Sequence, residues 1–140
     1  MRLIELLTTE NLQEEITREY LKLNQVIKKE LDINFCINIE NADDGEYVYA
    51  DESGYHYVYC ERGNVERNKI TDDVFEIVFW ALCPMIIRAS FEYELKNRNE
   101  ELNSRKVAFD KQIEFWTILG DNFKKRGEIE IDENLKVNPL

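Results

Sequence analysis

The fold is decided by three runs with the composition of short β-strands: EYVYA at residues 46–50, GYHYVYCE at 54–61 and NVERNKI at 64–70. A fourth candidate, FCINI, precedes them at 35–39. Glycine accepts the positive φ that tight hairpins require, so the dipeptides Asp44-Gly45 and Ser53-Gly54 are predicted turns. We therefore predict an antiparallel meander of three to four strands.

A helical pattern precedes the strands. From about Thr9 to Lys29, apolar residues recur at steps of three and four with charged residues between them, which predicts an amphipathic helix with Thr9 as its N-cap. Strands and helices do not alternate along the chain. The sequence therefore predicts an α+β fold, in which the meander packs against an N-terminal helix and long C-terminal helices.

The helical period returns after the strands, with Thr71 or Asp72 as the predicted cap. Pro84 interrupts this helix and lacks an amide hydrogen, so we expect a kink or two abutting helices. A third helix is predicted over about 103–125, ending before Gly127. The tail that begins at Gly127 is ambiguous between a short strand and a last helical turn.

Composition limits the function. The 140 residues, 44% of them hydrophobic, suffice for one core, so we predict a single domain over residues 1–140. The net charge of −11 repels phosphate backbones and anionic membrane surfaces, which argues against binding to nucleic acid or to a membrane. It would instead favour encounter with a basic protein partner.

The cysteines and the apolar segments suggest a location. The three cysteines, Cys36, Cys60 and Cys83, lie far apart and form no CxxC pair, which fits a reducing cytoplasm. The N-terminal apolar run is too short for a secretory signal, and we expect no segment of about 18 apolar residues that could span a membrane. We expect a soluble cytoplasmic protein.

No arrangement of residues favours catalysis. His56 is the only histidine, and strand alternation directs Glu61 to the opposite face, so the two should not converge as an acid-base pair. Zinc-ligand spacings, phosphate-binding glycine loops and hydrolase motifs are missing from the sequence, and Ala42 occupies a ligand position of the nearest calcium-loop alignment. We predict no catalytic residue, no metal and no cofactor.

Acidic and tyrosine residues are concentrated in one stretch. Between Leu31 and Cys60 there are seven acidic residues and no lysine or arginine, and five of the seven tyrosines lie there too. Aromatic anchors surrounded by carboxylates are typical of protein interfaces. The predicted partner-binding residues are Tyr47, Tyr49, Tyr55, Tyr57, Tyr59, Asp43, Asp44, Glu46, Asp51 and Glu52.

Strand alternation makes this patch specific. Tyr55, Tyr57 and Tyr59 should share one face of their strand, and we expect them to be at least partly accessible to solvent. The residues between them, His56, Val58 and Cys60, should then face the helices. The alternative is that helices cover the tyrosine face and leave only hydroxyls at its edge.

Several motifs recur in an order typical of a known family. They are YHYVYCERG (55–63), Thr71, YELKNR (93–98), RKVAFDKQIE (105–114) and a proline near the C-terminus. In this order and spacing the chain resembles the immunity protein 63 family of bacterial polymorphic toxin systems. The resemblance implies a small cytoplasmic α+β protein that binds and neutralises a cognate toxin, without catalytic residues.

The matched motif residues have a structural interpretation. Helical spacing brings Glu94 within one turn of Arg98 and Arg105 within one turn of Phe109. We expect a polar network that ties the end of the strand to the helices. Its predicted members are Glu61, Arg62, Gly63, Tyr93, Glu94, Arg98, Arg105 and Gln112.

The function favoured by the sequence is a non-enzymatic immunity protein whose partner is a cognate, basic toxin domain. A different class stays open: a small regulatory or adaptor domain of phage or mobile-element origin. A third and weaker alternative is an enzyme that uses His56 and Glu61.

Overall fold

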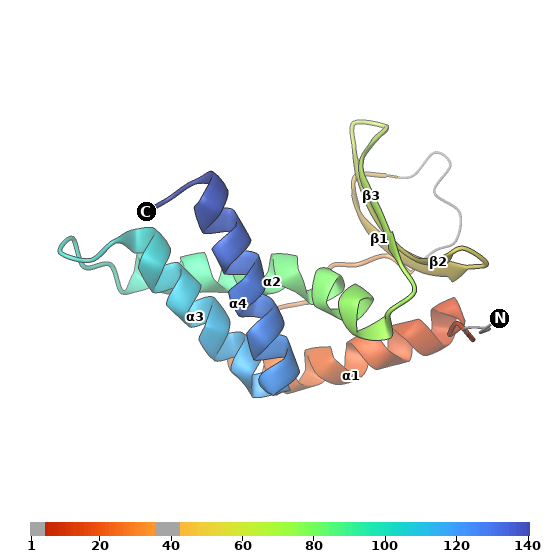
Figure 1. Cartoon of the computed structure of the whole chain (residues 1–140), viewed down its shortest axis with the longest axis horizontal. Helices are drawn as coiled ribbons and strands as arrows, with labels where there is room; N and C mark the ends of the chain where they lie inside the picture. The colour runs from red at the N-terminus through yellow and green to blue at the C-terminus, as the bar shows by residue number, and fades with distance from the viewer. Residues whose placement is uncertain (1–4, 36–42) are drawn as a thin grey trace. The chain divides into compact units, whose positions relative to one another are not determined.

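The computed structural model describes residues 5–35 and 43–140. Along the chain, as labelled in Figure 1, the elements are α1 (Thr9–Ile27), β1 (Gly45–Asp51), β2 (Gly54–Glu61), β3 (Asn64–Thr71), α2 (Val74–Lys96), α3 (Ser104–Leu119) and α4 (Asp121–Val137). The strands form an antiparallel sheet in the order β1-β2-β3. The α+β prediction is confirmed. Residues 36–39 of the fourth candidate strand lie outside the described residues.

The chain divides into two compact units. The first contains Met1–Leu21 and Glu30–Leu82, and the second contains Lys22–Lys29 and Cys83–Leu140. Helices α1 and α2 each contribute residues to both units. A single domain over the whole chain stays a prediction.

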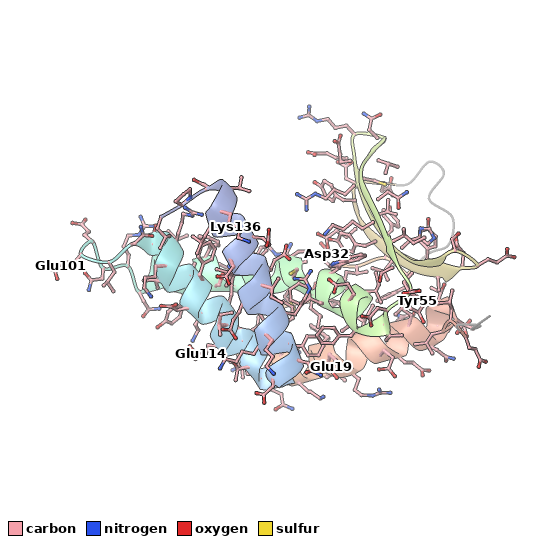
Figure 2. All side chains as sticks on the ribbon, viewed as in Figure 1. Glu19, Asp32, Tyr55, Glu101, Glu114 and Lys136 are labelled. Atoms are coloured by element: carbon pink, nitrogen blue, oxygen red, sulfur yellow. The ribbon has the colours of Figure 1, made fainter. Side chains whose placement is uncertain are left out.

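In the first unit, the N-terminal part of α1 is tied to the sheet. The Leu7 amide donates a hydrogen bond to the hydroxyl of Tyr55 at 2.8 Å, and Figure 2 shows Tyr55 beside this end of the helix. The Thr9 hydroxyl accepts from the Ala50 amide at 3.0 Å and donates to the Ala50 carbonyl at 3.3 Å. The face of β2 that carries Tyr55 is therefore the face that the helix covers.

The predicted orientation of β2 is consequently wrong. Tyr55 and Tyr57 are only 1% and 6% exposed, whereas Tyr59 is partly accessible as predicted. The opposite face is buried as well, because Val58 and Cys60 form a core cluster with Tyr47 and Tyr49. Alternation correctly sorted the β2 side chains into two faces, but it does not determine which face the helices cover.

The caps of α1 and α2 differ from those predicted. The Asn11 amide donates to the Thr8 hydroxyl at 3.1 Å, so Thr8 is the N-cap of α1 and Thr9 is released to bind the sheet. Asp73 caps α2, because its carboxylate accepts from the Phe75 amide at 2.9 Å. The Thr71 hydroxyl supports this cap by accepting from the Asp73 amide.

Helix α2 runs unbroken through Pro84, so two abutting helices are the wrong alternative. Three residues beside the proline are buried, namely Leu82 and Ile86 at 0% exposure and Met85 at 2%. Burial of these side chains offsets the missing hydrogen bond.

The expectation that no segment is long and apolar enough to span a membrane is wrong for helix α2. By length and composition alone it could span one, although we expected no such segment. The core helix of a soluble protein can have the same length and composition, and half of the most apolar stretch of α2 is buried inside the fold.

The predicted end of the third helix is wrong. Helix α3 stops at Leu119, where Gly120 adopts a φ of 118°, and α4 then continues through Gly127 to Val137. Gly127 is buried within α4 against the indole of Trp116. A Cβ at position 127 would lie 2.5 Å from Cδ1 of Trp116, so the glycine is required by packing and not by the end of a helix.

Candidate protein-binding site

The predicted acidic residues occupy both ends of the sheet. Asp43, Asp44 and Glu46 lie at the start of β1, whereas Asp51 and Glu52 lie at its end. A strand rises about 3.3 Å per residue, so the seven residues of β1 separate the two groups by about 20 Å. This separation exceeds two Debye lengths at physiological salt. The charges therefore form two local fields and not one.

The group at the start of β1 gains a further acidic residue. Glu46 pairs with Tyr59 across the β1–β2 ladder, and β2 ends at Glu61. The charge of Glu61, followed by burial and the charges of Asp44 and Glu46, raises the pKa of the Tyr59 hydroxyl. We call Asp44, Glu46, Tyr59 and Glu61 the acidic corner.

A tight turn holds the acidic corner in place. Arg62 and Gly63 connect β2 to β3 with φ values of 53° and 78°, as expected for a two-residue hairpin of type I′. The Arg62 amide donates to the Asp44 carboxylate at 2.7 Å, which joins the start of β1 to this turn. The Tyr47 hydroxyl donates to the Asp43 carbonyl at 2.8 Å. A preordered surface of this kind loses little entropy on binding.

The acidic group at the other end of the sheet is part of the β1–β2 turn. The Asp51 carboxylate accepts from the Ser53 amide and contacts Nε2 of His56, both at 2.8 Å. The hydrogen bond with His56 is the main cause that lowers the pKa of Asp51. The His56 ring also stacks on Tyr49, with centroids 4.5 Å apart. Asp51 therefore has a structural role, while Glu52 is exposed on the turn.

Four of the five predicted binding tyrosines are buried. Tyr47 and Tyr49 are 7% and 8% exposed, in addition to Tyr55 and Tyr57, so they can contribute little contact area to a partner. Tyr59 keeps an accessible ring among carboxylates. A partner-binding role for Tyr59 and the acidic residues stays a prediction, and Glu61 is the residue that the predicted binding patch omitted.

The suggested acid-base pair does not form. The side chains of His56 and Glu61 lie on opposite faces of β2, and His56 binds Asp51 instead. Within residues 5–35 and 43–140, no group of three histidine, cysteine or acidic side chains could hold a metal ion.

The family-motif residues on the helices belong to the second unit. The buried Glu94 carboxylate accepts two hydrogen bonds from the Arg98 guanidinium, at 3.0 and 2.9 Å, as the spacing predicted. Gln112 is buried and donates to the Ser90 hydroxyl at 3.1 Å, which links α3 to α2. Tyr93 is 40% exposed beneath the Lys111 ammonium.

Arg105 secures the C-terminal end of α4. Its guanidinium donates to the Asn134 side chain at 3.0 Å and to the carbonyls of Asn138 and Pro139 at 2.7 and 3.1 Å. It also lies 5.4 Å from the centroid of the Phe109 ring, in agreement with the predicted proximity. A cation at a helix C-terminus complements the helix dipole.

Within each unit, the family-motif residues form contacts of their own, and the predicted strand-to-helix network stays a prediction. Arg62 is bonded to Asp44 beside β1, whereas Glu94, Arg105 and Gln112 are bonded to helical residues or to the C-terminal segment. Spacing predicts contacts one helical turn apart, but the partners of Gln112 and Arg105 are set by helix packing.

The comparisons identify the family. The model of the immunity protein 63 family matches residues 51–133, more than half of the 140-residue chain. The chain belongs to the immunity protein 63 family. No curated protein matches it, and no solved structure does. The matched region begins at Asp51, the last residue of β1, and ends in α4, so it includes Tyr59 and Glu61 of the acidic corner.

Proposed function

We propose that this protein binds a cognate bacterial toxin of a polymorphic toxin system and neutralises it by direct contact. The observation that carries the proposal is the family match over β2, β3 and the three C-terminal helices. The exposed acidic corner supports a partner with a basic surface, because complementary charges speed association. The toxin and the immunity protein would meet in the cytoplasm, which agrees with the free thiols of Cys60 and Cys83.

The proposal is tested by coexpression with the toxin domain encoded beside the gene. We expect cells that produce both proteins to grow and the two proteins to copurify in a fixed ratio. Cells that produce the toxin domain with a catalytically inactive substitution should yield the same complex. Growth inhibition that persists, with no complex at micromolar concentrations, would contradict the proposal.

Immunity proteins of this family are generally non-enzymatic, and we propose the same for this chain. The replacement His56→Gln removes the only imidazole while leaving an amide that can still donate to Asp51. We expect this variant to protect toxin-expressing cells as well as the unaltered protein does, provided that its melting temperature is preserved. Loss of protection in a variant that is folded and still binds the toxin would instead indicate catalysis.

A further inference from the structure

The second unit contains a basic groove in an otherwise acidic protein. The groove encloses about 460 Å³ and is lined by residues from the end of α1, the last turns of α2 and the middle of α3. Its charged residues are Lys28, Lys29, Lys96, Lys111 and Glu92, so lysines outnumber carboxylates by four to one. The chain as a whole carries −11, which makes this local excess of positive charge unusual.

Two of the four lysines already hold carboxylates of the chain itself. The Lys29 ammonium lies 2.5 Å from the Glu92 carboxylate, and this hydrogen bond lowers the pKa of Glu92. The Lys111 ammonium lies 3.0 Å from the Glu114 carboxylate. Of these two carboxylates only Glu92 lines the groove, and each of the two positive charges is matched.

The other two lysines form no ion pair of this kind, and the charge of Lys96 acts on Glu92 only as a further cause of its lowered pKa. Lys28 and Lys96 are exposed, and neither has an ion-pair partner within 4.0 Å among the residues that the structure describes. Lys28 has a φ of 55°, a conformation that glycine adopts more readily after a helix. A lysine here costs about 1–2 kcal/mol of backbone strain but places an ammonium at the groove. Helix dipoles stabilise both lysines without neutralising a full charge.

Two aromatic residues, Tyr93 and Phe115, line the groove beside its lysines. The Lys111 ammonium lies 4.2 Å from the Tyr93 ring centroid and 5.2 Å from that of Phe115. The Lys111 side chain is only 17% exposed, so the ion pair with Glu114 and the two aromatic rings hold it in one position. Tyr93 keeps 40% of its surface exposed beside these charges. Aromatic surface can pack against the methylene groups of an acidic side chain while the ammonium groups bind its carboxylate.

We infer that the basic groove binds an acidic peptide segment of a protein partner, with Lys28 and Lys96 as the ligands of its carboxylates. Charge complementarity supports this occupant, because two ammonium groups that form no ion pair within the described residues flank aromatic surface in a groove where lysines outnumber carboxylates. The inference rests on the proposed function only for the identity of the partner. It gives the protein a second interaction surface of opposite sign to the acidic corner.

Titration with hexaglutamate peptide tests the inference without a toxin. In ¹⁵N-labelled full-length protein we expect saturable shifts of the amide resonances of Tyr93, Lys96 and Asn97. The double variant Lys28→Gln/Lys96→Gln should weaken binding at least fivefold. The matched control is Lys124→Gln/Lys125→Gln, which removes the same charge from exposed positions of α4 and should retain the affinity of the unaltered protein.

Three results would overturn the inference. They are the absence of saturable shifts, equal weakening in both double variants, and shifts of the same residues by inorganic phosphate at equal or lower concentration. The last would identify a site for small anions. Failure of toxin coexpression would remove the proposed function but leave the hexaglutamate result intact, so the two failures can be distinguished.

Discussion

Replacement of Gly127 by alanine is expected to lower the free energy of unfolding by about 1–3 kcal/mol. In most helix interiors the same replacement stabilises a protein, because alanine exceeds glycine in helix propensity by about 1 kcal/mol. Here the added Cβ would lie 2.5 Å from Cδ1 and 3.0 Å from Nε1 of Trp116. The indole is only 2% exposed and stacks on Phe123 with a centroid distance of 5.8 Å, so it has little room to move.

Urea denaturation measures this effect. The control is Glu128→Ala, one residue further along α4, where the side chain is exposed and alanine should change stability by at most about 0.5 kcal/mol. A variant Gly127→Ala that is more stable than the unaltered protein would show that α3 and α4 do not pack as described.

Neutralisation of the acidic corner is expected to slow association with the cognate toxin about tenfold at low salt. The variant Glu46→Gln/Glu61→Gln removes two charges beside Tyr59 and keeps the size of each side chain. Asp44 and Asp51 are left unchanged, because their carboxylates accept main-chain hydrogen bonds within the turns. Steering charges act mainly on the association rate, so the dissociation rate should change little.

Surface plasmon resonance at several salt concentrations measures both rates. The double variant should also show a flatter salt dependence, whereas Glu128→Gln/Asp132→Asn, which removes two exposed charges from α4, should not. Replacement of the accessible Tyr59 by alanine should instead raise the dissociation rate. If the corner variant kept the original association rate at low salt, the net charge would be explained by solubility alone.

Local patterns in the sequence predicted most of the secondary structure. The helix predicted from about Thr9 to Lys29 is observed over Thr9–Ile27, and the strand alternation of β2 was correct, because periodicity is set by the backbone itself. The ion pair of Glu94 with Arg98 was also predictable, since both residues lie on one helix. The end of α3 was misplaced because a glycine can mark either a helix end or a close contact. Gly120 ends α3, whereas Gly127 lies in close contact with Trp116.

The functional surfaces were only partly predictable. Carboxylates near in sequence were taken as one patch, but an extended strand separates Asp44 from Asp51. The basic groove was not predictable from the sequence, because Lys28, Lys96 and Lys111 are far apart along the chain and line one groove only through helix packing.

The sequence by itself determined the α+β class, the family motifs and the concentration of negative charge before β3, because composition and periodicity are local properties. Only the tertiary structure decided that the helix covers the Tyr55 face, that Gly127 accommodates Trp116, and that lysines gather in an acidic protein. These features depend on which surfaces meet. Packing between elements is a long-range interaction that no local pattern encodes.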